Sequence, residues 1–96
     1  MHNDNELAYF AGFFDGEGSV GAKSIGSSFT VRAAVGNTDP EIIANFGTRF
    51  GGTVKEVRQQ GNRKHFYRWE TWGATAEEFL KLVLPFLRIK KDRVLL

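Results

Sequence analysis

The 96-residue chain contains no cysteine, only two prolines, and no apolar run long enough to cross a membrane. Without cysteine it has no disulfide scaffold, no thiolate metal site and no cysteine nucleophile. Its first six residues, from Met1 to Glu6, are too polar and acidic for a secretory or transit peptide. These features predict a soluble intracellular protein, and the length predicts a single domain over residues 1–96.

Charge is unevenly distributed along the chain, although the net charge is only +2. Residues 1–50 hold three basic and six acidic side chains, whereas residues 51–96 hold ten basic and five acidic ones. A basic half of this kind indicates a polyanionic partner, and nucleic acid is the common one.

A first helix is predicted over residues 4–16, because Asn3 and Glu6 form a capping pair in front of it. One stripe of this helix has almost no side chains: Ala8, Gly12 and Gly16. Each glycine inside a helix costs about 1 kcal/mol relative to alanine. The stripe therefore predicts that another backbone approaches the helix closely.

Extended segments over residues 18–25, 29–35, 53–60 and 65–72 read as strands. Asp39 followed by Pro40 predicts the start of a second helix, and a capping box of Thr75 and Glu78 predicts a third. The order αββαββα predicts an α+β fold, in which a four-stranded antiparallel sheet carries its helices on one face.

The uncovered face of the predicted sheet is polar and largely basic. By alternation it carries Lys23, Thr30, Arg32, Glu56, Arg58, Gln60, Arg68 and Glu70. Ser28 and Phe66 complete this expected DNA-contact surface, together with Arg63 and Lys64 in a turn suited to phosphate contact. A twisted strand ribbon with such side chains can lie in a DNA major groove.

Residues 10–18, Phe-Ala-Gly-Phe-Phe-Asp-Gly-Glu-Gly, form a small-residue helix that ends in acid–small–acid–Gly. Residues 84–90 read Leu-Pro-Phe-Leu-Arg-Ile-Lys. With these motifs and the αββαββα order, the chain resembles the LAGLIDADG homing endonuclease family over its whole length. The resemblance implies a homodimeric saddle on double-stranded DNA, with the motif helices paired through Ala8, Gly12, Asp15 and Gly16. It also implies hydrolytic cutting of a near-palindromic site with Mg²⁺, in a site that Mn²⁺ or Ca²⁺ can also occupy, as in intron homing.

Glu17 is the expected catalytic carboxylate and metal ligand, and a plain solvated carboxylate is its alternative. A carboxylate at a helix C-terminus faces the negative end of the macrodipole and so favours a bound divalent cation. The resemblance gives Asn37 a role in organising solvent around the metal and Lys90 a role in stabilising negative charge. An Asx turn is the alternative for Asn37. A solvated lysine in a basic tail is the alternative for Lys90, and Arg88 or Lys91 can replace it in the site.

Two further alternatives concern Asp15 and the function as a whole. Asp15 is expected to bond backbone near the helix end rather than to catalyse. The same fold can serve as a non-cleaving DNA- or RNA-binding module of the maturase kind, and a structural protein without a nucleic-acid role is the other rival. The scaffold and the basic sheet are common to the first two, so the sequence leaves them open.

Overall fold

The computed structural model describes residues 3–58, 61 and 65–94. Its elements follow the predicted order and end in a 3₁₀ turn and a short helix: α1 (Asp4–Glu17), β1 (Gly18–Ile25), β2 (Ser28–Asn37), α2 (Pro40–Phe50), β3 (Thr53–Val57), β4 (Phe66–Trp72), α3 (Gly73–Val83), η1 (Leu84–Phe86) and α4 (Lys91–Val94). The predicted α+β fold is confirmed. None of the described helices combines the length and apolarity that crossing a bilayer requires.

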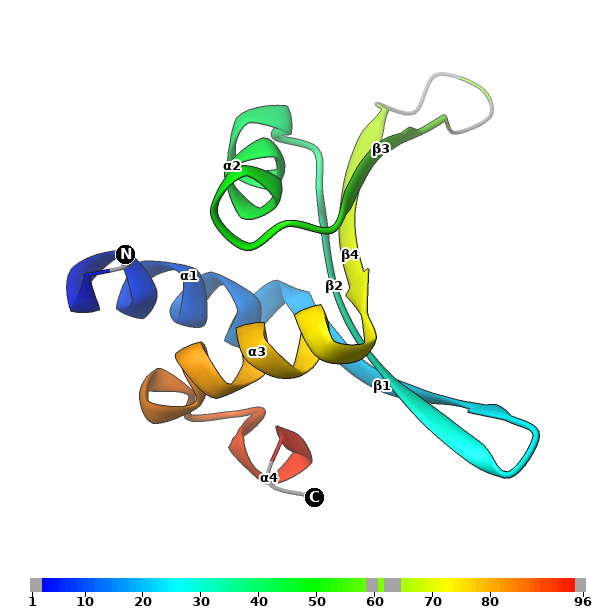
Figure 1. The fold of residues 1–96 in the computed structure, drawn as a ribbon. Coiled ribbons are helices and arrows are strands. Elements are labelled where there is room, and N and C mark those ends of the chain that lie inside the picture. Colours follow the sequence, from blue (N-terminus) through cyan, green and yellow to red (C-terminus); the bar gives the residue numbers. More distant parts are fainter. Residues whose placement is uncertain (1–2, 59–60, 62–64, 95–96) are drawn as a thin grey trace.

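The sheet is antiparallel throughout, with the strand order β1-β2-β4-β3. Figure 1 shows it as a curved layer with α1, α2 and α3 all on one side, so its concave side is open. We call the helix-covered side the inner face and the open side the outer face. The predicted placement of the helices on one face is therefore confirmed.

The core lies between the inner face and the three long helices. Trp69 is its centre: its ring lies within about 5 Å of Phe46 and Phe79 by centroid distance, and its Nε1 donates to the carbonyl of Gly51 at 2.6 Å. Phe14 of α1 meets Phe79 edge-on at 5.1 Å. Tilted and edge-to-face ring pairs of this kind add to the stabilisation from apolar burial.

The predicted start of the third helix is wrong. α3 begins at Gly73 directly after β4, and no side chain caps it. Gly73 has a φ of 63°, a left-handed conformation that turns the strand into the helix without a loop. By contrast, Asn3 accepts from the N–H of Glu6 and Asp39 accepts from that of Glu41, so the other two predicted caps are confirmed.

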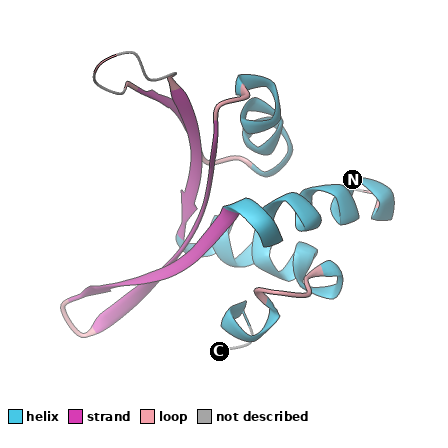
Figure 2. Cartoon of the chain, turned by 180° about the vertical axis from the view of Figure 1, so that it is seen from behind, coloured by secondary structure: helices cyan, strands magenta, loops and turns pink. Residues whose placement is uncertain are grey.

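Phe29 is on the inner-face side of β2 by alternation, but it is 77% exposed. The hairpin of β1 and β2 extends beyond the helices, as Figure 2 shows, so the described helices leave most of the Phe29 ring uncovered. Strand alternation predicts the face of a side chain, whereas the length of the covering layer decides its burial.

Candidate nucleic-acid interface and carboxylate site

Cross-strand pairing defines which side chains share the outer face. Lys23 pairs with Thr30, Arg32 with Trp72, Thr53 with Glu70, Lys55 with Arg68 and Val57 with Phe66. The outer face therefore carries Lys23, Ser28, Thr30, Arg32, Thr53, Lys55, Val57, Phe66, Arg68, Glu70 and Trp72. Seven of these belong to the predicted contact surface; Thr53, Lys55, Val57 and Trp72 were not in it.

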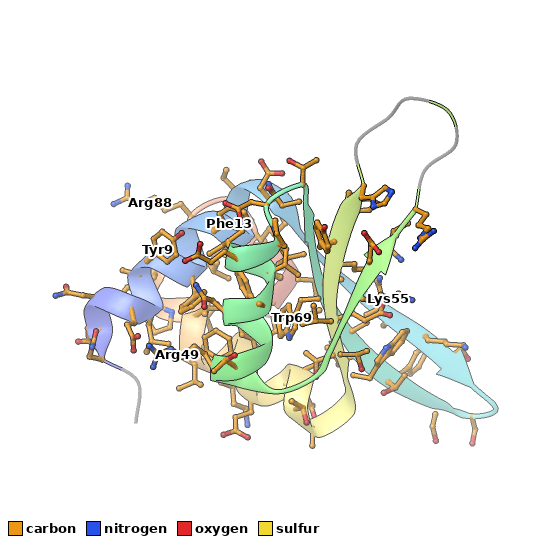
Figure 3. The ribbon with its side chains drawn as sticks, turned by 90° about the horizontal axis from the view of Figure 1, so that it is seen from above. Tyr9, Phe13, Arg49, Lys55, Trp69 and Arg88 are labelled. Carbon is orange, nitrogen blue, oxygen red and sulfur yellow. The ribbon has the colours of Figure 1, made fainter. Side chains whose placement is uncertain are left out.

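The predicted face of β3 is wrong. Glu56 pairs with Tyr67 on the inner-face side, where it contacts His65, and Arg58 lies within 4.0 Å of Glu56. Lys55 takes the outer position instead, and Figure 3 shows Lys55 and Trp69 on opposite sides of the sheet. Gln60, Arg63 and Lys64 lie outside the described residues.

The contact between Val54 and Gly47 determines which β3 side chains lie on the inner face of the sheet. A Cβ on Gly47 would lie 2.7 Å from the Val54 side chain, so α2 and β3 meet closely only because Gly47 has none. Val54 and Val57 have opposite parity, so alternation along the strand gives no answer about which of them points inward. The sequence contains no local signal that selects Lys55 over Glu56.

Glu70 bridges two cations on the outer face. Its Oε2 accepts from Nε and Nη2 of Arg32 at 3.2 and 3.0 Å, and its Oε1 lies 3.5 Å from Nζ of Lys55. Burial raises the pKa of the Glu70 carboxyl, but the hydrogen bonds and charges of Arg32 and Lys55 lower it by more, so the net shift is downward. Glu70 thus holds the guanidinium of Arg32 in place on the outer face.

A hollow of about 300 Å³ lies on the outer face where β1 leaves α1. Glu17, Arg32 and Arg68 line it. The Phe66 ring forms part of its floor, since a Cβ on Gly36 would lie only 2.5 Å from that ring. The guanidinium of Arg68 lies over the same ring, 5.6 Å from its centroid. One carboxylate and two cations thus converge on this hollow.

Glu17 is the last residue of α1, so the predicted carboxylate at a helix C-terminus is confirmed. Its side chain is exposed and makes no hydrogen bond or ion pair with the rest of the described chain. The next residue, Gly18, lets the chain turn into β1 against the Phe14 ring, where a Cβ would lie 2.4 Å from a ring carbon. Close packing here fixes the backbone next to Glu17 and leaves its carboxylate accessible.

Asp15 joins the C-terminal segment to α1. It is 7% exposed, and its carboxylate accepts the backbone N–H groups of Arg88, Ile89 and Lys90 at 2.6 to 3.0 Å. Burial raises the pKa of this carboxyl, but those three hydrogen bonds and the charge of Lys90 outweigh it and lower the pKa overall. The expected backbone-bonding role of Asp15 is confirmed.

Lys90 is buried rather than solvated, so its alternative as a tail lysine is wrong. Its Nζ donates to the main-chain carbonyl of Asp15 at 2.6 Å, at the C-terminal end of α1 where cations are favoured. Arg88 and Lys91 are both exposed. The side chain of Asn37 accepts from the N–H of Asp39 at 2.9 Å, which is the Asx turn given as its alternative.

The small-residue stripe of α1 is open. A Cβ added at Gly12 or at Gly16 would meet nothing within 4 Å, and Ala8 is exposed. These residues line one side of a groove of about 630 Å³, and residues 85–89 line the other. Packing inside the described chain thus gives no reason for the two helical glycines.

The sequence matches no family model and no curated protein, but solved structures do match it. The homing endonuclease I-CvuI, in complex with its target, superposes with a TM-score of 0.77 at 23% identity over 94% of this chain. The archaeal intron-encoded homing endonuclease I-Vdi141I, complexed with DNA, gives 0.72 at 21% over 98%, and the homing endonuclease I-TnaI gives 0.59 at 20% over 91%. This chain has the LAGLIDADG homing endonuclease fold.

The chain spans about 61% of the length of I-CvuI and 65% of that of I-Vdi141I. Within this homing endonuclease fold, the residues expected to be catalytic divide into two groups. Glu17 opens onto the hollow of the outer face, whereas Asn37 and Lys90 bond to backbone and do not line that hollow.

Proposed function

We propose that this chain is a site-specific endonuclease for double-stranded DNA that acts as a homodimer with a divalent metal. One observation carries the proposal: the accessible carboxylate of Glu17 lies where the open stripe of α1 meets the basic outer face. A second copy packed on that stripe brings a second Glu17 to the same seam. In this proposed dimer, the two Glu17 carboxylates lie next to the two strands of the duplex.

The donor set suits Mg²⁺ or Mn²⁺, because a carboxylate oxygen is a hard ligand. The described part of one chain contains no cluster of three or more histidine or acidic side chains, so a metal held by Glu17 would need further ligands from phosphate, water or the second copy. When bound, the metal would supply an activated water and would stabilise charge on the leaving oxygen. I-CvuI has been solved on DNA with Ca present and, with Mg present, on DNA that is not cleaved, which supports a divalent cation here.

The remaining residues bind and orient. The outer-face cations Lys23, Arg32, Lys55 and Arg68 attract the duplex, and Ser28 and Thr30 add hydroxyl groups for contacts to bases or phosphate. Asp15 and Lys90 hold the C-terminal end of α1, and this keeps Glu17 at a fixed place beside the hollow.

Glu17→Gln tests the proposal. We expect cleavage of a duplex selected from a randomised library in Mg²⁺ to fall by about 100-fold or more, because the neutral amide is a far weaker metal ligand. DNA affinity is expected to stay close to that of the unmodified chain. The matched control is Glu78→Gln, an exposed position on α3 away from the outer face. Loss of binding together with cleavage would show that Glu17 is structural and would overturn its catalytic role.

A non-cleaving DNA- or RNA-binding module is the second candidate, and one observation favours it. Asn37 and Lys90 are both engaged in backbone hydrogen bonds, so Glu17 alone of the expected catalytic residues is exposed and unpartnered in the described chain. Selective binding without cleavage in either Mg²⁺ or Mn²⁺ would establish this candidate. Competition between duplex DNA and structured RNA then identifies its ligand.

A further inference from the structure

Arg32 is held on two sides, unlike the other cations of the outer face. Its Nε and Nη2 donate to Oε2 of Glu70, and its guanidinium carbon lies 5.5 Å from the centroid of the Trp72 ring. The Arg32 side chain is 28% exposed and that of Glu70 is 16% exposed. Arg32 lies on β2 and both of its partners lie on β4, which pairs directly with β2 here, so the sheet itself sets their spacing.

The two N–H groups of Arg32 that donate to Glu70 leave one edge of the guanidinium available for another acceptor. A guanidinium has five N–H donors, and Glu70 takes one from Nε and one from Nη2. Within the described chain, the edge formed by Nη1 and the second Nη2 hydrogen has no acceptor. That edge has the fork geometry that pairs with O6 and N7 of guanine in the major groove.

Arg68 and Lys55 provide the comparison on the same surface. Arg68 stacks over Phe66 but has no carboxylate partner among the described residues. Lys55 contacts only the other oxygen of Glu70, at 3.5 Å, and is 51% exposed. These two cations keep more freedom than Arg32. A mobile cationic side chain can contact phosphate, because that contact is possible from many directions. Hydrogen bonding to a base edge requires a side chain held in one fixed orientation.

Glu70 opposes DNA binding by its charge, since a carboxylate on this face repels phosphate. We propose that Arg32 reads a guanine of the target, that Glu70 and Trp72 are the positioning residues that fix it, and that Arg68 contacts phosphate. The inference rests on the proposed function. Holding Arg32 in place before binding lowers the entropy lost on forming a bidentate contact, and this offsets the repulsion from Glu70.

The test is a binding selection from a randomised duplex library without cleavage, comparing Arg32→Lys, Arg68→Lys and Glu70→Gln with the unmodified chain. Arg32→Lys is expected to lose preference for guanine at one base pair of each half-site by about 5-fold to 150-fold. Arg68→Lys keeps every base preference, because lysine still neutralises phosphate. Glu70→Gln is expected to lose preference at the Arg32 position and to bind random duplex more tightly. Glu77→Gln, exposed on α3, is the charge-matched control.

A double variant separates positioning from a purely structural role. Because Glu70 acts through Arg32, adding Glu70→Gln to Arg32→Lys is expected to change base preference no further. A uniform loss of preference at all positions with Glu70→Gln, matched by a lower unfolding temperature, would show a structural role and overturn the inference. Unchanged base preference in Arg32→Lys would also overturn it. If the unmodified chain selects no sequence and its binding does not depend on salt, the proposed function itself fails.

Discussion

Asp15 and Glu17 are two acidic residues two positions apart on one helix, and their surroundings separate their roles. Successive helical residues differ by about 100° around the axis, so the two side chains leave α1 on nearly opposite sides. Asp15 is buried and satisfied by three backbone N–H groups, whereas Glu17 is exposed and has no partner in the described chain. The acidic pair of the motif therefore divides into one structural and one accessible carboxylate.

Asp15→Asn is expected to destabilise the chain by roughly 2–4 kcal/mol, because an amide replaces charge-assisted bonds and turns an N–H donor toward the N–H groups of residues 88–90. Urea unfolding at neutral pH measures this loss. Asp92→Asn is the control, since Asp92 is exposed and has no hydrogen bond in the described chain. Equal stability of the two variants would contradict the role assigned to Asp15.

The lowered pKa of Asp15 gives its contribution a pH dependence. Because the folded pKa lies below that of an unfolded aspartate, about 3.9, the stabilisation is complete above that value and is lost as pH falls through the folded pKa. The stability difference between the unmodified chain and Asp15→Asn is therefore expected to shrink between pH 5 and strongly acidic pH. A difference that stays constant over that range would rule out the carboxylate as its source.

The helix α1 carries two kinds of glycine, and geometry distinguishes them. Gly18, at its end, packs against the Phe14 ring and leaves no room for a Cβ. Gly12 and Gly16 face open space in the described chain. The first kind serves the fold of one chain, whereas the second has no packing role within the described chain and fits the close helix contact of the proposed dimer.

Gly16→Ala is expected to affect folding and association in opposite directions. The free energy of unfolding of the single chain is expected to rise by about 1 kcal/mol, because alanine is the better helix former. The added methyl group has no described atom within 4 Å and so causes no clash. Association weakens, because the methyl group keeps a second helix away. Urea unfolding measures the first effect and sedimentation over a concentration series measures the second. Unchanged association in Gly16→Ala would remove the stripe as the dimer contact, while Gly18→Ala, which clashes with Phe14, is expected to destabilise folding alone.

The curved sheet gathers cations from all four strands onto one side of the molecule. Lys23, Arg32, Lys55 and Arg68 come from different parts of the chain, and strand pairing alone brings them together. The concave outline in Figure 1 presents this set to a single convex partner. Affinity for a duplex is therefore expected to depend strongly on salt.

Lys55→Ala is expected to weaken binding to random duplex uniformly and to lower the slope of log affinity against log salt by about one for each copy of the chain. The same removal of charge in Lys81→Ala, on the helix side of the molecule, leaves the slope unchanged. Titrations at several salt concentrations measure both slopes. Identical slopes for the two variants would show that the outer face does not contact phosphate.

Local patterns in the sequence were enough to predict α1, its cap at Asn3 and the αββαββα order. Capping residues, periodicity and turn residues all act over a few neighbouring positions. They also placed Arg32 and Arg68 on one face, because β2 and β4 alternate clearly. Tertiary structure decided the rest: the face of β3 through packing of Val54 on Gly47, and the engagement of Asp15 with residues 88–90. These depend on contacts between segments far apart in sequence, and such contacts leave no local periodic trace.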